Sequence, residues 1–179
     1  VVPQHYPLLV GWIGMIGIIM TLHFGLFDLL SCGWRTIGVD ARPIMNGPLI
    51  SRSISEFWGV RWNTAFRDLT HRFLFLPLIP RIGARLTVLI AFLFSGLIHD
   101  LVISIPAGGG YGGPTIFFLI QGIAILLSRS MMGKKIGLRH GLIGWSFAVL
   151  VLLLPLFMLF HPVFVQEVII PFMKTMGAI

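Results

Sequence analysis

Charged side chains are scarce in this sequence: they make up 11% of its 179 residues, whereas 56% of the residues are hydrophobic. Soluble domains have about 25% charged residues, so the composition excludes an ordinary soluble domain. Acidic residues are rarest, since 6 Asp and Glu stand against 13 Lys and Arg and leave a formal charge of +7. Apolar runs long enough to cross lipid favour a membrane protein with basic cytoplasmic loops over a nucleic-acid-binding protein. We therefore expect no nucleic-acid partner.

Cysteine is nearly absent too, because Cys32 is the only one in the chain. A single thiol makes no internal disulfide and has no second thiol with which to bind a metal, so we expect neither. An initiator methionine is also missing, and no basic segment precedes the first apolar run after the opening Val-Val-Pro. We interpret residues 1–179 as a single transmembrane domain from the C-terminal part of a longer chain, or as a mature chain, rather than as a signal peptide followed by a domain.

Four apolar stretches are long enough to be considered membrane spans, which need about 20 residues to cross about 30 Å of hydrocarbon. The third stretch is short, and Pro155 is expected to kink the fourth. Two further apolar pieces are too short or too interrupted to span, and we expect them to be interfacial or re-entrant. The sequence thus predicts an all-α, polytopic transmembrane bundle of about four spans plus amphipathic helices. The spans lie at about 8–31, 86–105, 114–127 and 142–160, and the two shorter pieces lie at 73–79 and 163–173.

The basic residues are concentrated in two of the segments between spans. Residues 34–85 hold eight arginines and residues 129–141 hold four Lys or Arg, whereas the Gly-rich turn at 106–114 holds none. Four alternating spans put both basic segments on the same side, and the excess of Lys and Arg makes that side cytoplasmic. We therefore expect an integral protein of a bacterial inner membrane with both basic segments in the cytoplasm.

Ionisable side chains within the spans are candidate functional groups, because each costs about 2.5–3.5 kcal/mol to insert. His99 lies about 14 residues into the second span, with Ser95 one turn earlier on the same helix face. A buried histidine tied to a neighbouring helix is the alternative interpretation of His99. Asp100 points about 100° away around the helix and is expected nearer the outer interface. For His23 and Asp28 we expect polar contacts between helices.

The cytoplasmic segment 51–73 is both basic and aromatic. Ser53 followed three residues later by Glu56 predicts a capping box at the start of a helix. Read as one helix, the segment has an apolar stripe that includes Trp58 and Trp62, and a basic side. This pattern is typical of an amphipathic helix that lies among the lipid headgroups with its tryptophans as anchors.

The polar residues of this segment each have two alternative interpretations. Arg61, Arg67 and Arg72 either contact anionic lipid or accept an anionic substrate group, such as the phosphates of coenzyme A. Asn63 either packs against another helix or donates a hydrogen bond to a reacting carbonyl. The spacing alone does not choose between these readings.

Two strings together resemble the membrane-bound O-acyltransferases, and most closely their wax-synthase-like branch. The strings are EFWGVRWN at 56–63 and FLFSGLIHD at 92–100, and the resemblance covers about residues 43–105, which we treat as the acyltransferase core region. Val60 occupies a position that is often Arg in the family, and Asp100 replaces the commoner Glu.

The resemblance implies transfer of an acyl group from acyl coenzyme A to the hydroxyl of a lipophilic acceptor within the membrane. It implies that His99 is the general base and that Asn63 orients the thioester or stabilises its oxyanion. A covalent acyl-Ser95 is a less favoured route, because such a hydroxyl more often bonds to its own helix. Acyl coenzyme A is then a co-substrate, with no permanently bound cofactor and no metal. The substrate-binding residues expected around this pair are Arg61, Arg67, Arg72, Trp58, Trp62 and Ser95.

Two other functions are alternatives to acyl transfer. Because members of the family have more spans than the four seen here, the chain is alternatively a non-catalytic subunit that reuses the scaffold and has other membrane subunits as partners. A transporter or proton channel built on His23, Asp28, His99 and Asp100 is weaker, since the third and fourth spans offer few polar groups. The enzyme's partners would instead be membrane lipid, acyl coenzyme A and a lipophilic alcohol.

Overall fold

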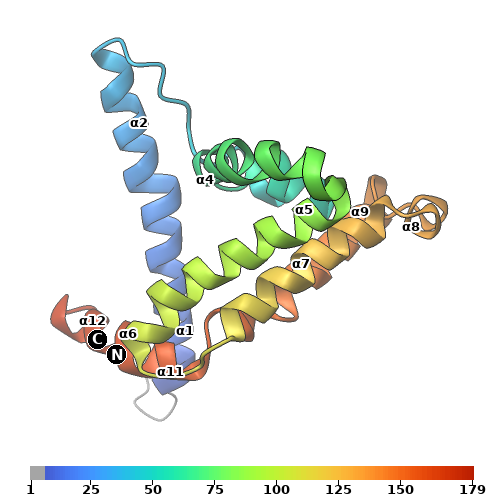
Figure 1. Ribbon diagram of the computed structural model, residues 1–179. Helices are drawn as coiled ribbons and strands as arrows, with labels where there is room; N and C mark the ends of the chain where they lie inside the picture. Colours follow the sequence, from blue (N-terminus) through green and yellow to red (C-terminus); the bar gives the residue numbers. More distant parts are fainter. Residues whose placement is uncertain (1–6) are drawn as a thin grey trace.

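The computed structural model describes residues 7–179, which form helices joined by turns (Figure 1). The opening Val-Val-Pro lies outside the described residues. Within residues 7–179, three helical stretches are long and apolar enough to cross a membrane, and a shorter apolar helix accompanies them. The all-α, membrane-spanning class is therefore confirmed, with the third expected span short, as the sequence indicated. The long stretches are Pro7–Thr36, Thr64–Ala107 and Gly141–Leu159, and the shorter helix is α7 (Gly113–Arg129).

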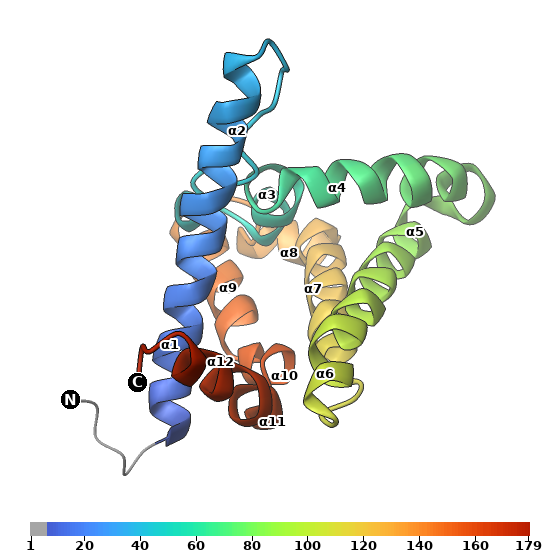
Figure 2. The ribbon, with the colours of Figure 1, turned by 90° about the vertical axis from the view of Figure 1, so that its left-hand side faces the viewer.

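The first span is one long helix at the edge of the molecule (Figures 1 and 2). It consists of α1 (Pro7–Thr21), η1 (Leu22–Leu26) and α2 (Phe27–Thr36). Within this helix, α1 packs on the C-terminal segment, and Gly14 permits this approach because a Cβ there would lie 2.2 Å from the sulfur of Met173. The buried residues of this contact are Met15, Val165, Ile169 and Met173.

The segment before the second span begins with the predicted cap. Ser53 Oγ accepts a hydrogen bond from the Glu56 backbone N–H at 3.2 Å, which begins α3 (Ile54–Glu56). The Glu56 carboxylate accepts from the Arg52 backbone N–H at 2.8 Å, so the reciprocal half of the capping box falls one residue earlier than expected. The chain then continues into η3 (Phe57–Arg61).

The prediction of a single helix over 51–73 is wrong, because the helix stops at Trp62 and Asn63. Trp62 is extended, with φ −100° and ψ 126°, and Asn63 is left-handed, with φ 42° and ψ 63°. Asparagine tolerates this region and caps helices well, so it both ends one helix and begins the next. Its Oδ1 accepts from the Phe66 backbone N–H at 3.1 Å at the start of α4 (Thr64–Thr70).

The second span bends sharply before it descends. The helices η4 (His71–Phe75) and α5 (Leu76–His99) follow α4 without a break in the helical assignment, but Gly83 inside α5 has φ 76° and ψ 161°. Only glycine adopts this conformation readily, so the part before Gly83 lies across the top of the molecule and the rest of α5 runs down beside α7 (Figure 2). Residues 73–79, expected to be interfacial or re-entrant, belong to the crossing part.

The C-terminal third consists of one span and several short helices. Pro155 separates α9 from α10, which is the break expected in the fourth span. Residues 163–173 lie within one uninterrupted helical stretch at the foot of α1, which is shorter than a membrane span (Figure 2). The elements are α8 (Met131–Ile136), α9 (Gly141–Leu153), α10 (Leu156–Leu159), α11 (Pro162–Phe164), η6 (Val165–Ile169) and α12 (Ile170–Thr175).

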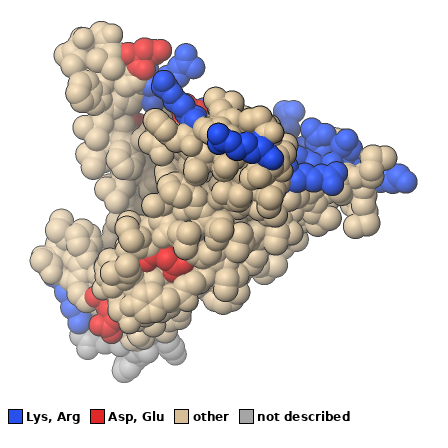
Figure 3. Space-filling view, viewed as in Figure 1, with Lys and Arg blue, Asp and Glu red and all other residues tan. Residues whose placement is uncertain are grey.

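Lys and Arg side chains gather on the side of the molecule that carries α4 and α8, away from most of the C-terminal segment (Figure 3). The two basic segments, 34–85 and 129–141, thus share one side, as the alternation of spans predicts. The chain is an integral membrane protein by its apolar helices.

Candidate active site

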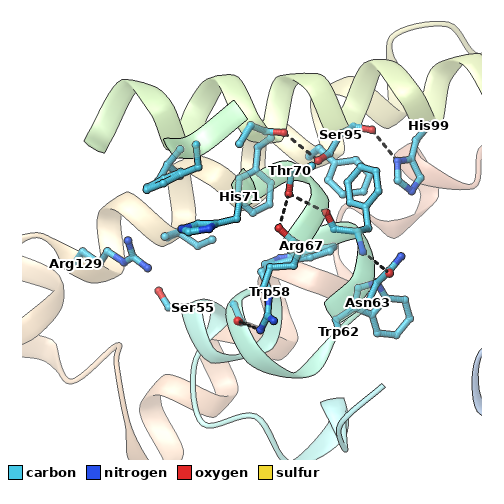
Figure 4. A pocket seen from close by; sticks show the side chains of 18 residues that line it. Ser55, Trp58, Trp62, Asn63, Arg67, Thr70, His71, Ser95, His99 and Arg129 are labelled. Carbon is cyan, nitrogen blue, oxygen red and sulfur yellow. Dashed lines mark hydrogen bonds between the residues drawn. The ribbon is translucent and has the colours of Figure 1, made fainter. Parts of the chain in front are cut away.

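A pocket of about 390 Å³ lies between the α3 to η4 region on one side and α5 and α7 on the other (Figure 4). It brings together the two residues expected to carry the chemistry, although they come from different elements. Its walls are largely aromatic and aliphatic, and its polar and charged lining residues are Ser55, Asn63, Arg67, Thr70, His71, Ser95, His99 and Arg129, with Trp58 and Trp62 among the aromatic ones.

His99 is the last residue of α5, and local contacts fix its ring. Its Nδ1 lies 2.7 Å from the backbone oxygen of Ser95. A carbonyl oxygen only accepts, so Nδ1 carries the proton and Nε2 of the neutral ring has a free lone pair. The ring packs on Phe118 with 4.3 Å between centroids and meets the edge of Phe66 at 6.5 Å. The imidazole is therefore oriented and retains one basic nitrogen.

The side chain of Asn63 provides hydrogen-bond donors that complement the basic nitrogen of His99. Its Oδ1 is engaged by the Phe66 backbone N–H, so the amide is oriented by the start of α4. Its own backbone N–H donates to the sulfur of Met45 at 3.4 Å, and the neighbouring Thr64 N–H donates to the oxygen of Ile44 at 2.9 Å. With Oδ1 occupied, the two Nδ2 hydrogens are the donors that Asn63 can offer to a ligand in the pocket.

The three arginines proposed for substrate binding are placed differently from one another. Arg61 is bound within the protein, with Nε 2.6 Å from Glu56 Oε1 and Nη1 3.0 Å from the oxygen of Asn46, and it does not line the pocket. The Arg52 backbone N–H and then the Arg61 side chain hold the pKa of Glu56 below its usual value. The structure therefore does not bring Arg61 to the pocket, because that side chain holds the turn before α4.

Arg67 is the member of the set that lines the pocket, whereas Arg72 does not. The Arg67 Nη1 donates to the oxygen of Gly59 at 2.7 Å, and its Nε lies 2.8 Å from Asp68 Oδ1. These bonds hold the guanidinium beside the pocket wall, so a continuous row of three cations is not formed. The break at Asn63 explains this, because it changes the register between Arg61 and the two later arginines.

Four polar residues that the sequence did not assign to substrate binding also line the pocket, and one of them is Thr70 of α4. Arg129 comes from the end of α7, His71 from η4 and Ser55 from α3. The Ser55 Oγ is buried without a hydrogen-bond partner among residues 7–179. Figure 4 shows Arg129 at the end of the pocket opposite His99. The signal for Arg129 was its position as the charged residue that ends an otherwise apolar span; His71 and Ser55 gave no such signal.

The two tryptophans form part of the pocket wall, and inner residues hold them. Trp58 Nε1 donates to Gln121 Oε1 at 3.4 Å, and Gln121 is fully buried. Trp62 stacks between Phe57 and His23, with centroid distances of 5.4 and 5.5 Å. Aromatic rings of the protein cover both tryptophans. Their contacts therefore differ from those of the outward-facing lipid anchors that the sequence predicted.

Ser95 does not form a nucleophile–base pair with His99. Its Oγ donates to the backbone oxygen of Ala91 at 2.9 Å, and His99 contacts the Ser95 carbonyl rather than its hydroxyl. The residue lines the pocket, but the route through an acyl-Ser95 lacks the contact that would activate the hydroxyl.

The first-span candidates do not make the expected polar contacts between helices. His23 Nδ1 bonds to the oxygen of Ile19 in its own helix at 3.0 Å, and its contact with the rest of the protein is the stack on Trp62. Asp28 Oδ1 is buried without a partner in the described part of the chain. Among residues 7–179, the expected polar contacts between helices are therefore not formed by either residue. Within residues 7–179, no three His, Cys, Asp or Glu side chains gather as a metal site would require.

Fold and site together define a helical membrane protein in which a histidine within a span and an asparagine donor share one pocket. Residues 41–120 match the profile of the membrane bound O-acyl transferase family, which confirms the resemblance of the two strings. This segment contains both Asn63 and His99.

The relatives are plant enzymes and are distant. A probable long-chain-alcohol O-fatty-acyltransferase 3 of Arabidopsis thaliana is 31% identical over 102 residues, which are 49% of this chain and 28% of the relative. The long-chain-alcohol O-fatty-acyltransferase of Simmondsia chinensis is 26% identical over 122 residues, 61% of this chain and 34% of the relative. The chain thus spans about a third of the length of these relatives. No solved structure matches it significantly.

Proposed function

We propose that this chain carries the catalytic pair of an enzyme that transfers an acyl group from acyl coenzyme A to the hydroxyl of a lipophilic alcohol. The observation that supports it most is that His99 and Asn63 line one pocket, and that His99 Nε2 and Asn63 Nδ2 have no hydrogen-bond partner among residues 7–179. The names of the plant relatives favour a long-chain alcohol as the acceptor.

In the proposed reaction, the acceptor hydroxyl gives its proton to His99 Nε2 while its oxygen attacks the thioester carbonyl. The carbonyl oxygen becomes an oxyanion, which accepts a hydrogen bond from Asn63 Nδ2. Collapse of this intermediate breaks the carbon–sulfur bond and releases the ester. The departing thiolate takes the proton back from the imidazolium, so His99 returns to its starting state.

The environment of the pair suits this chemistry. The hydrogen bonds of His99 Nδ1 and Asn63 Oδ1 orient both groups before substrate binds, so little reorganisation is needed when charge develops. We assign Arg67 and Arg129 to the polar part of the acyl donor, since both line the pocket and one lies at the end opposite His99. The aliphatic and aromatic wall then contacts the acyl chain.

The same pocket argues against the non-catalytic subunit. A reused scaffold gives no reason to keep an oriented basic nitrogen beside a cavity, whereas acyl transfer requires one. We place the segments 34–85 and 129–141 on the cytoplasmic side of a bacterial inner membrane, where a soluble acyl donor would reach the pocket.

The test uses the full-length protein, purified in lipid nanodiscs, with acyl coenzyme A and a long-chain alcohol. We expect ester formation, and we expect His99→Ala to lower kcat about 10²- to 10⁴-fold, the usual contribution of a general base. The control is His140→Ala, since His140 is exposed and lies outside the pocket. Full activity of the His99→Ala protein would exclude the proposed mechanism.

A further inference from the structure

The carboxylate of Asp100, the residue after His99, accepts four hydrogen bonds. Its Oδ1 accepts from Ser104 Oγ at 2.8 Å and from the Gly112 backbone N–H at 2.9 Å. Its Oδ2 accepts from the Thr115 backbone N–H at 3.1 Å and from the Thr115 hydroxyl. Since a carboxylate has about four lone-pair positions, Asp100 has its full set of partners.

These bonds join two walls of the pocket. Asp100 continues α5 as the first residue of η5 (Asp100–Ser104), whereas Gly112 and Thr115 lie at the N-terminus of α7, where a negative charge is favourable. The two helices also cross closely at this level, because a Cβ on Gly96 would lie 2.6 Å from Thr115 Cα. Thr115 is thus held by a van der Waals contact and by the carboxylate together, which fixes the register of α7 against α5.

This register determines the surroundings of His99. Phe118 lies three residues after Thr115, about one helical turn along α7. The His99 ring rests on Phe118 at 4.3 Å between centroids. A shift of α7 along α5 would move Phe118 away from the imidazole and change the direction of Nε2.

The C-terminal segment also supports Asp100, because His161 contacts Ser104, which binds the carboxylate. His161, 6% exposed, accepts the Phe164 backbone N–H at Nδ1, with 3.1 Å between the nitrogens. Its Nε2 therefore carries the proton and faces Ser104 Oγ at 3.4 Å. Ser104 in turn donates to Asp100, so the hydrogen bonds run in one direction from the C-terminal segment to the carboxylate.

We infer that Asp100 is a positioning residue for the proposed acyl transfer: by binding Thr115 and Gly112 of α7, it holds the His99 imidazole in the orientation that proton transfer requires. This inference rests on the proposed function. Asp100 itself does not line the pocket and takes no part in bond making.

A matched pair of substitutions tests the inference. Thr115→Val keeps the shape and the backbone N–H but removes the hydroxyl, whereas Thr115→Ser keeps the hydroxyl. We expect Thr115→Val to lower kcat about tenfold with little change in KM, since misplacement of a catalytic group by about 1 Å costs up to about 10²-fold. Thr115→Ser should restore most of kcat, and Asp100→Asn should lose more than Thr115→Val, because an amide nitrogen then faces backbone N–H donors.

A chemical probe separates this inference from the proposed function. Diethyl pyrocarbonate modifies free imidazole nitrogens, and mass spectrometry gives the rate at His99 relative to exposed His140 in folded, monodisperse protein. We expect Thr115→Val to change this ratio and Thr115→Ser to preserve it. Unchanged kcat in Thr115→Val, together with an unchanged ratio, would overturn the inference. A wild-type protein without transferase activity would instead refute the proposed function, and the modification ratio alone would then decide whether Asp100 and Thr115 position His99.

Discussion

The rings of His99 and His161 each use Nδ1 in a local hydrogen bond, but with opposite polarity. His99 Nδ1 donates to a carbonyl oxygen, and its Nε2 is left as a base beside a pocket. His161 Nδ1 accepts from a backbone N–H, and its Nε2–H is directed at Ser104. The comparison shows that the nearest backbone group selects the tautomer of a histidine and thereby the task open to it.

The largest expected difference between substitutions of His99 and of His161 is in catalytic activity. Asparagine at either position removes the imidazole but keeps a polar side chain. His99→Asn should lower kcat about 10²-fold or more, because the general base is lost. His161→Asn should mainly affect stability, lowering Tm by about 3 °C, as expected for about 1 kcal/mol in a chain of this size. Ester formation and thermal unfolding in the same detergent measure both effects. Equal loss of kcat in the two variants would contradict the division of roles.

Asn63 sharpens the comparison, because one side chain combines a structural oxygen with a proposed catalytic nitrogen. Asp at this position keeps the oxygen that caps α4 and tolerates the left-handed backbone, but it offers no N–H donor. We expect Asn63→Asp to lower kcat about 10²- to 10³-fold with little change in Tm. Asn63→Ala serves as the comparison, since it should lose both the activity and the cap. A fully active Asn63→Asp protein would show that Asn63 acts only as a cap.

The next prediction concerns His161 and the way the Tm of the protein responds to acid. Burial lowers the pKa of His161 below its usual value of 6.5. A histidine with a lowered folded-state pKa contributes its stability above the unfolded-state pKa and loses it as the pH falls through the folded-state pKa. We therefore expect Tm to fall as the pH is lowered below about 6.5, and to fall less in His161→Asn. Parallel curves for wild type and variant would mean that another group causes the acid response.

Much of the fold follows from patterns that act over a short range. The apolar stretches, the break at Pro155 and the cap at Ser53 were predicted because each depends on residues close in sequence. The bend at Gly83 and the break at Asn63 were missed. The residues around Asn63 suit a helix, and the contacts of its backbone with Met45 come from the folded chain. At Gly83 a local signal was present, because Pro77 and Pro80 just before it are unfavourable inside a helix.

The candidate site likewise has residues that the sequence predicted and residues whose roles depend on folding. The string resemblance singled out His99 and Asn63, and the structure places both at one pocket. The arginines were less predictable, because their roles depend on partners brought close by folding. Glu56 binds Arg61 locally, whereas Arg129 reaches the pocket from α7. The four hydrogen bonds that Asp100 accepts come from Ser104, one helical turn away, and from Gly112 and Thr115, which lie at the start of α7 beyond the Gly-rich turn.

The smallest expected effect concerns the contact between the first span and the pocket. His23 stacks on Trp62, which lines the pocket and is stacked on Phe57 from the other side. Such an aromatic contact contributes about 0.5–1.5 kcal/mol, so His23→Ala should raise KM for the alcohol about threefold and leave kcat nearly unchanged. His23→Phe restores a ring without a titratable nitrogen and should return KM to its starting value. If His23→Phe behaves like His23→Ala, the imidazole acts through its polarity, and the first span then takes part in the chemistry rather than only supporting the pocket wall.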